Sequence, residues 1–138
     1  EMGNTVVAIS PDSKALYHAA AVMVSNQIVA LADMGTVLLV KCGFSEAAAA
    51  EALSPLLLGN AQSVAEKGAV NALTGPIERG DAQTVSKHLQ EIRKFAGEST
   101  VGQDILTAYT ALSKQLIRIA QQKHPQKDYK HLEKELEQ

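Results

Sequence analysis

The chain is poor in the residues from which many functional sites are built. Its 138 residues contain no tryptophan, aromatic residues make up only 4%, and Cys42 is the single cysteine. Because aromatic side chains are scarce, base stacking on nucleic acid is not expected. A lone cysteine cannot form an internal disulfide, which fits a reducing, cytoplasmic environment.

Charge and recognisable motifs are equally sparse. The formal net charge is −2 and charged residues make up 20% of the chain, so neither a polyanion-binding surface nor a membrane-surface protein is indicated. There is no phosphate loop, no Gly-rich dinucleotide fingerprint and no His-Glu-x-x-His pair. His88, His124 and His131 are expected on solvated faces, and no metal site is predicted.

The longest apolar stretch runs over residues 10–43. Ser10 can cap a helix that starts with Pro11, and Gly43 can take the left-handed conformation that ends one. The stretch of about thirty residues is longer than most helices and apolar over most of its circumference, so we expect a buried central helix. Its predicted apolar wall consists of Leu16, Ala20, Met23, Leu31, Met34 and Leu38.

Polar residues interrupt this apolar run. By helical geometry Lys14, His18 and Ser25 fall within about 40° of one another, and Asn26 lies on an adjacent row with Asp33. Such groups argue against a transmembrane span, and no signal peptide is visible. Buried polar groups left unpaired cost about 1–3 kcal/mol each, so these residues need partners or a ligand.

The rest of the chain predicts an all-α fold of about six helices. Residues 4–10 are rich in β-branched residues and favour a strand, which needs a partner to be stable. After the long apolar stretch we expect a helix over 46–53 capped by Ser45, and a second helix that restarts at Ser54-Pro55 and runs to about Lys67. A loop over 74–80 should follow, and then a helix over 81–95 capped by Asp81. The last predicted elements are a helix with a Thr100–Gln103 capping box that ends before Pro125, and a solvated tail helix over 126–138.

Three sequence blocks together carry a family resemblance: KALYHAAAVMVSN from Lys14, GFSEAAAAEALSPLLLGN from Gly43 and ALTGPIERGDAQTVSKHL from Ala72. They resemble the helical C-terminal domain of predicted Rossmann-like NAD(P)-dependent oxidoreductases, known as domain of unknown function 2520. The resemblance covers about residues 6–121. It implies an all-α fold similar to the 6-phosphogluconate dehydrogenase C-terminal-like superfamily, whose members include ketopantoate reductase and pyrroline-5-carboxylate reductase.

The resemblance also implies a division of the chain. Residues 1–10 would be the strand or linker remnant of a Rossmann domain, residues 11–123 the helical domain, and residues 124–138 a charged tail helix. NAD(P) is implied for the parent protein, with none bound by this chain alone. In such proteins the helical domain closes the substrate cleft and often forms a homodimer.

The candidate site lies on the long helix and the 74–80 loop. Some relatives carry a catalytic Lys and Asn one turn apart, whereas here Lys14 and Asn26 are twelve positions apart, so that pair is not reproduced. We expect His18 to be the acid–base group, because an imidazole exchanges protons near neutral pH. Lys14 or Arg79 would hold an anionic substrate group, Asn26 would orient a carbonyl, and Ser25 and Thr74 would line the cleft.

Two functional interpretations remain open at this stage. The first is the substrate-cleft and dimerisation domain of a cytoplasmic NAD(P)-dependent oxidoreductase that takes a small-molecule substrate. The second is a non-enzymatic helical interaction or sensor module whose parent binds a nucleotide without turning over. A separate alternative for the site alone is that His18 and Asn26 only satisfy buried backbone groups between helices. A Gly-x-Gly-x-x-Gly sequence upstream of Glu1 would favour the first.

Overall fold

A computed structural model describes residues 6–137 and divides the chain into two compact units, 1–57 and 58–138. Helices make up all the regular secondary structure of the described part, and no strand occurs there. The prediction of an all-α, multi-helix fold is confirmed. The predicted strand over 4–10 is wrong for residues 6–10, which have no regular secondary structure. Asn4 and Thr5 lie outside the described residues.

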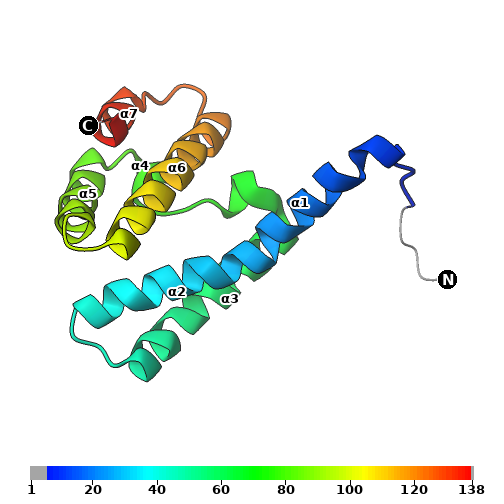
Figure 1. The fold of residues 1–138 in the computed structure, drawn as a ribbon. Helices are drawn as coiled ribbons and strands as arrows, with labels where there is room; N and C mark the ends of the chain where they lie inside the picture. The colour runs from blue at the N-terminus through cyan, green and yellow to red at the C-terminus, as the bar shows by residue number, and fades with distance from the viewer. Residues whose placement is uncertain (1–5, 138) are drawn as a thin grey trace. The chain divides into compact units, whose positions relative to one another are not determined.

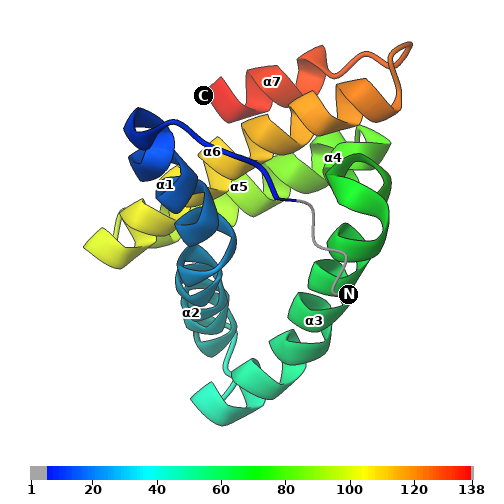
Figure 2. The same ribbon diagram turned by 90° about the vertical axis from the view of Figure 1, so that its right-hand side faces the viewer.

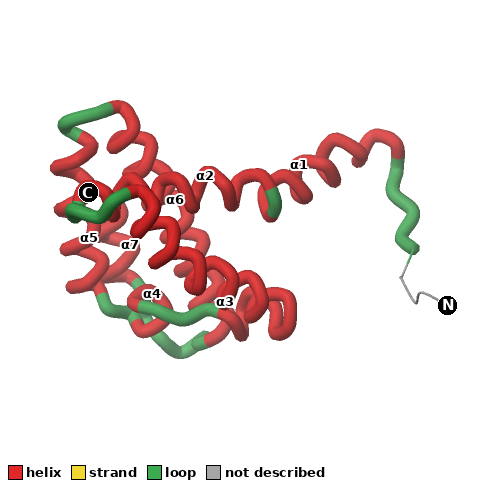
Figure 3. Tube along the Cα trace, turned by 90° about the horizontal axis from the view of Figure 1, so that it is seen from below, coloured by secondary structure: helices red, strands yellow, loops and turns green. Residues whose placement is uncertain are grey.

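The first unit begins with three helical segments in line: η1 (Pro11–Ser13), α1 (Lys14–Val24) and α2 (Asn26–Lys41). We call these segments together the arm. Figure 3 shows α1 and α2 following one another along one line with a short break between them, and the break is Ser25. The break is small, because the Ser25 N–H still donates to the carbonyls of Ala21 and Val22.

Local sequence signals at the two ends of the arm are confirmed. The Ser10 hydroxyl accepts a hydrogen bond from the Asp12 N–H at 3.3 Å, and Pro11 occupies the first turn. At the other end Gly43 has a φ of 96°, and the Phe44 N–H reaches back to the Leu39 carbonyl. This is the Schellman arrangement that a glycine permits.

The arm is exposed, so the prediction of a buried central helix is wrong. Neither α1 nor α2 contains a buried residue, and Leu16 and Met23 expose 76% and 62% of their surface. The helical periodicity of the sequence indicates which faces of the arm are apolar. Whether those faces are buried depends on which other elements pack against them. Within this unit, α3 (Glu46–Ala72) meets α2 at Gly35, where an added Cβ would lie 3.1 Å from Leu53 Cδ1.

The helix α3 is longer than the sequence indicated (Figures 1 and 2). Ser45 caps it as predicted, since its hydroxyl accepts from the Ala48 N–H at 3.2 Å. The predicted restart at Ser54-Pro55 is wrong, because Pro55 lies inside one continuous helix. Gly68, which directly follows the predicted helix end at about Lys67, has a non-helical φ of 73° and kinks α3 before a last turn.

The second unit contains the end of α3 and four further helices: α4 (Pro76–Arg79), α5 (Ala82–Ala96), α6 (Thr100–Lys123) and α7 (Lys130–Glu137). The segment 74–80, predicted as a loop, contains the single turn α4. The α6 cap is Ser99 rather than Thr100, since the Ser99 hydroxyl accepts from the Gly102 N–H at 3.0 Å. As predicted, α6 ends before Pro125.

The core of the second unit includes the C-terminal tail. Leu89 and Val85 of α5 are fully buried, and Leu132 and Leu136 of α7 expose only 1% and 4% of their surface. The prediction of a solvated, fraying tail is therefore wrong. Charged residues dominate the α7 sequence, but its two leucines are four residues apart and enter the core together. The core residues are Leu73, Ile77, Val85, Leu89, Ile117, Ala120, Tyr129, Leu132 and Leu136.

The arm is also the stretch whose composition comes closest to that of a membrane span. Among residues 6–137, the segment Pro11–Lys41 is long and apolar enough to cross a membrane, with a mean hydropathy of 1.5 over its best window. Core helices and signal sequences of soluble proteins pass the same test. The expectation that this segment does not span a membrane, based on its polar residues, stays a prediction.

Candidate functional site

A short polar contact in the second unit joins Glu78 of α4 to His124, which follows the last turn of α6. His124 Nε2 lies 2.6 Å from Glu78 Oε1, and Lys123 Nζ lies 3.6 Å from the same oxygen. The hydrogen bond from His124 lowers the pKa of Glu78 below its ordinary value of 4.5, against an opposing effect of desolvation. The charges of Lys123, His124 and Lys127 lower it further.

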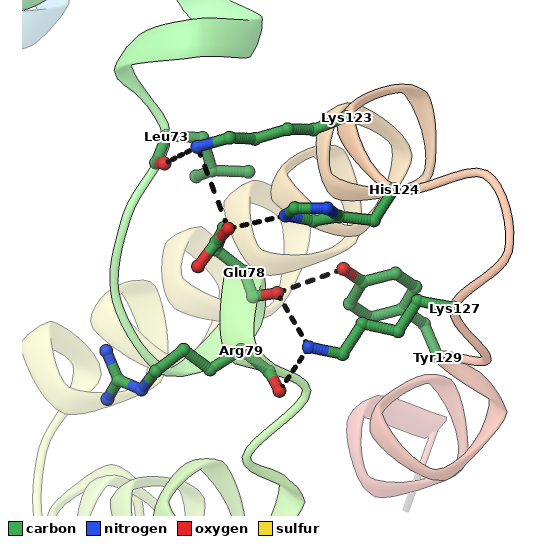
Figure 4. A network of polar contacts seen from close by, with 7 residues as sticks. All are labelled: Leu73, Glu78, Arg79, Lys123, His124, Lys127 and Tyr129. Atoms are coloured by element: carbon green, nitrogen blue, oxygen red, sulfur yellow. Dashed lines mark hydrogen bonds and ion pairs between the residues drawn. The ribbon is translucent and has the colours of Figure 1, made fainter.

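The same group of side chains also binds the backbone around α4 (Figure 4). The Tyr129 hydroxyl donates to the Glu78 carbonyl at 3.0 Å, and Lys127 Nζ donates to the Arg79 carbonyl at 2.6 Å. Lys123 Nζ donates to the Leu73 carbonyl at 2.8 Å. We call Glu78, Lys123, His124, Lys127 and Tyr129 the α4 cluster. Tyr129 and Lys127 satisfy the carbonyls of Glu78 and Arg79, which a one-turn helix leaves without partners.

The α4 cluster therefore fastens α4 to the end of α6 and to the segment before α7. A carboxylate–imidazole pair can also hold and transfer a proton, and the His124 side chain remains 39% exposed. A shallow hollow of about 530 Å³ lies beside it and is lined by Lys123, His124, Pro125, Gln126 and Lys127. The two lysine amines already donate to backbone carbonyls, so the hollow is not a ready-made anion site.

Four of the predicted site residues lie on the arm. Lys14 and His18 are exposed and stand one turn apart on α1, so they share a face. Ser25 Oγ donates to the Ala21 carbonyl at 2.7 Å and to Asn26 Oδ1 at 3.1 Å. The structure thus brings Ser25 and Asn26 together at the break between α1 and α2.

The other two predicted site residues, Thr74 and Arg79, lie beside and within α4 in the second unit. Both are exposed, and the Arg79 guanidinium points away from the α4 cluster (Figure 4). Asp81 caps α5 as predicted: its carboxylate accepts from the Thr84 hydroxyl at 2.7 Å and the Thr84 N–H at 3.0 Å. These bonds from Thr84 lower the pKa of Asp81.

Sequence reasoning missed the α4 cluster, because its contacts join residues about fifty positions apart. His124 was expected on a solvated face, and nothing near it in the sequence points to Glu78. Tyr129, an aromatic residue within a charged tail, was the one available signal. His88 is exposed as expected, yet its Nδ1 lies 2.9 Å from the Tyr109 hydroxyl. Burial raises the pKa of Tyr109, and a hydrogen bond with Ser113 opposes this rise.

The described part of the chain contains no candidate metal site. No group of three or more His, Cys, Asp or Glu side chains there is arranged so that it could hold a metal ion.

These features define an all-α domain with an exposed apolar arm and a braced second unit. Residues 1–116 match a protein family described as Domain of unknown function (DUF2520), and the chain belongs to that family. The match ends before the residues that contact Glu78 in the α4 cluster. No curated protein and no solved structure matches the chain.

Proposed function

We propose that this chain is the substrate-cleft and dimerisation domain of an NAD(P)-dependent oxidoreductase whose dinucleotide-binding domain lies outside these residues. The exposed arm is the observation that carries the proposal. Val29 exposes 70% of its surface, Leu16 76% and Met23 62%. Monomeric soluble proteins rarely leave a large contiguous apolar surface in water.

The exposed apolar surface of the arm favours burial against a partner. Covering apolar surface gains about 25 cal/mol per Å², so an arm of 31 residues with many exposed aliphatic side chains favours association strongly. A preceding domain and a second copy of the chain would together supply that cover. Clefts between domains are also where small-molecule sites tend to form.

The cofactor belongs, in this proposal, to the other domain. The chain has no Gly-rich turn that would let a backbone approach a pyrophosphate. The helix ends at Ser45, Asp81 and Ser99 are each occupied by the cap's own side chain, which leaves their N–H groups less available to a phosphate. NAD(P) would supply the hydride chemistry, and this chain would bind and orient the substrate.

His18 is the proposed acid–base residue. It is exposed on the same face of α1 as Lys14, where it can exchange a proton with a substrate held by the lysine ammonium. Asn26 would orient a substrate carbonyl, with its amide oxygen held by Ser25. These roles need only the arm and the domain that precedes it.

The proposal is tested in the protein that carries the residues upstream of Glu1. That protein should bind NADPH or NADH, whereas residues 1–138 alone should bind neither. His18→Ala should abolish turnover with little change in Tm, and the matched variant His131→Ala, at an exposed position of α7, should retain it. A longer protein that binds no dinucleotide would contradict the proposal, and one that binds a dinucleotide without turning over any substrate would favour the interaction or sensor module. A His18→Ala variant that melts early but turns over normally would show that His18 is not the acid–base residue.

A further inference from the structure

We propose that the arm pairs with the arm of a second copy as an antiparallel helix pair, with its two-fold axis between Asn26 and Gln27. This inference rests on the dimerisation role proposed above, and it specifies the surface and the register. Every residue that it uses belongs to the first unit.

The proposed contact surface is one row of side chains along the arm. At 100° per residue, its members all fall within an arc of about 100° on one face of the helix. Counted inward from either end, the spacings are four, three, four and three residues, which is the pattern of a knobs-into-holes seam. The row consists of Asp12, Leu16, Ala19, Met23, Asn26, Gln27, Ala30, Met34, Val37 and Lys41. We call it the seam.

The seam is available for a partner. None of its members is buried, and Leu16 and Met23 are among the most exposed large apolar residues of the arm. Leu53 of α3 packs at Gly35, about 130° around the helix from the middle of the seam. The contact with α3 therefore lies away from the middle of the seam, of which only Met34 and Val37 are half-buried.

The seam is complementary to itself when reversed. In the antiparallel register, Met23 faces Ala30 of the second copy and Ala19 faces Met34 of the second copy. Each long side chain thus meets a small one, as close packing of two helices requires. At the centre Asn26 faces Gln27 of the second copy. The Asn26 side chain has two N–H groups, so one can donate to the Gln27 amide oxygen while the other stays available to a substrate carbonyl.

The two ends of the seam favour the antiparallel direction. Asp12 would lie near Lys41 of the second copy, and opposite charges stabilise a register that a parallel pair would replace with like charges. Leu16 of one copy would pack against Val37 of the other. A hollow of about 340 Å³ lies there, lined by Asp33, Thr36, Val37, Val40, Lys41 and Glu46, and it can receive the leucine.

A second copy fits the seam better than a lipid bilayer does. Asn26 and Gln27 sit at the middle of the apolar run, where hydrocarbon offers amides no partner. In a second copy, Gln27 provides a hydrogen-bond partner for Asn26, and Asn26 provides one for Gln27. The seam is also interrupted by charge only at its two ends, where the paired arms would meet water.

Cysteine cross-linking tests the register directly. On a Cys42→Ser background, Asn26→Cys places two thiols beside the axis, and mild oxidation should double the mass on a non-reducing gel. Leu16→Cys is the matched control, since the two copies of residue 16 would lie about 31 Å apart along the pair. That separation far exceeds the roughly 4.4–6.8 Å between Cα atoms that a disulfide spans. This variant should therefore keep the mass of one chain on the non-reducing gel. Leu16→Cys combined with Val37→Cys should cross-link again.

The outcomes separate this inference from the proposed function. Cross-linking of Leu16→Cys alone as efficient as that of Asn26→Cys would overturn the antiparallel register. So would a chain that sediments as a dimer while Asn26→Cys remains uncross-linked, although the two-copy role would then stand. A helical monomer that floats with phosphatidylcholine vesicles would overturn the pairing in favour of a membrane surface, and dinucleotide binding by the longer protein would be unaffected. Circular dichroism of each variant checks that the helices are retained.

Discussion

Glu78 Oε1 and His124 Nε2 lie 2.6 Å apart, although 46 positions separate the two residues in the chain. This contact joins the single turn α4 to the end of α6. The hydroxyl of Tyr129 and the amine of Lys127 both donate to the backbone carbonyl of Glu78. A segment rich in glycine and proline is held in place by side chains that follow α6.

The Glu78 carboxylate should stabilise the second unit in a pH-dependent way. Its pKa is lowered in the folded chain, mainly by the hydrogen bond from His124. A lowered pKa means that the stabilisation is present above the ordinary value of 4.5 and is lost as the pH falls through the folded value. Urea unfolding should therefore show Glu78→Gln with a lower midpoint than the wild type at pH 7, and a shrinking difference toward pH 3.

Glu91→Gln provides the control for this pH series. Glu91 pairs with Lys94 on the surface of α5, and its side chain is 71% exposed. Surface pairs of this kind contribute little, so its unfolding midpoint should follow that of the wild type at every pH. A difference between the wild type and Glu78→Gln that stays constant from pH 7 to pH 3 would show that the carboxylate charge is not responsible.

Helix α7 should be an integral part of the second unit. Leu132 exposes 1% of its surface and packs with Leu89 and Val85 of α5 in one core. Leu132→Ala should lower the free energy of unfolding by about 2–5 kcal/mol, the usual cost of truncating a buried leucine. Leu112→Ala, at a position 43% exposed, should cost much less. Equal losses in the two variants, measured by chemical unfolding, would argue that α7 does not dock.

Gly102 should tolerate no side chain. It is buried in the first turn of α6, where an added Cβ would overlap the backbone carbonyl of Phe95. Backbone atoms cannot move aside as a side chain can, so Gly102→Ala should destabilise the chain by about 1–3 kcal/mol. Gly59→Ala is the matched control, because nothing lies within 4 Å of its added Cβ. Inside α3 it should instead stabilise by up to about 1 kcal/mol. Thermal melts of the two variants should shift in opposite directions.

The sequence predicted those parts of the fold that local chemistry determines. Ser10, Ser45 and Asp81 cap their helices through hydrogen bonds to residues two or three positions away, and such caps can be read from a short window. The α6 cap was placed one residue late because Ser99 and Thr100 both carry a suitable hydroxyl. Gly43 ends α2 because its φ of 96° disfavours other residues.

Features that depend on distant contacts escaped prediction. The arm is apolar enough to be a core helix, but burial requires a partner that its own sequence does not supply. Pro55 reads locally as a helix start, although one lost hydrogen-bond donor was tolerated inside α3. The contacts His124–Glu78 and Tyr129–Glu78 of the α4 cluster join residues 46 and 51 positions apart. The docking of α7 likewise depends on distant residues, since Leu132 shares a core with Val85 and Leu89 of α5. Of the candidate site, the sequence could identify residue types on the arm, and their proposed roles stay predictions.

Sedimentation of residues 1–138 over a range of concentrations tests most directly the claim that the arm is an association surface. The account predicts a mass of twice 14.7 kDa for the wild type and a monomer for Met23→Asp, which places a charge in the middle of the seam. Leu58→Asp, at an exposed position of α3 outside the arm, should remain dimeric. A wild-type chain that stays at 14.7 kDa at every concentration, or a Met23→Asp variant that dimerises like the wild type, would contradict the account.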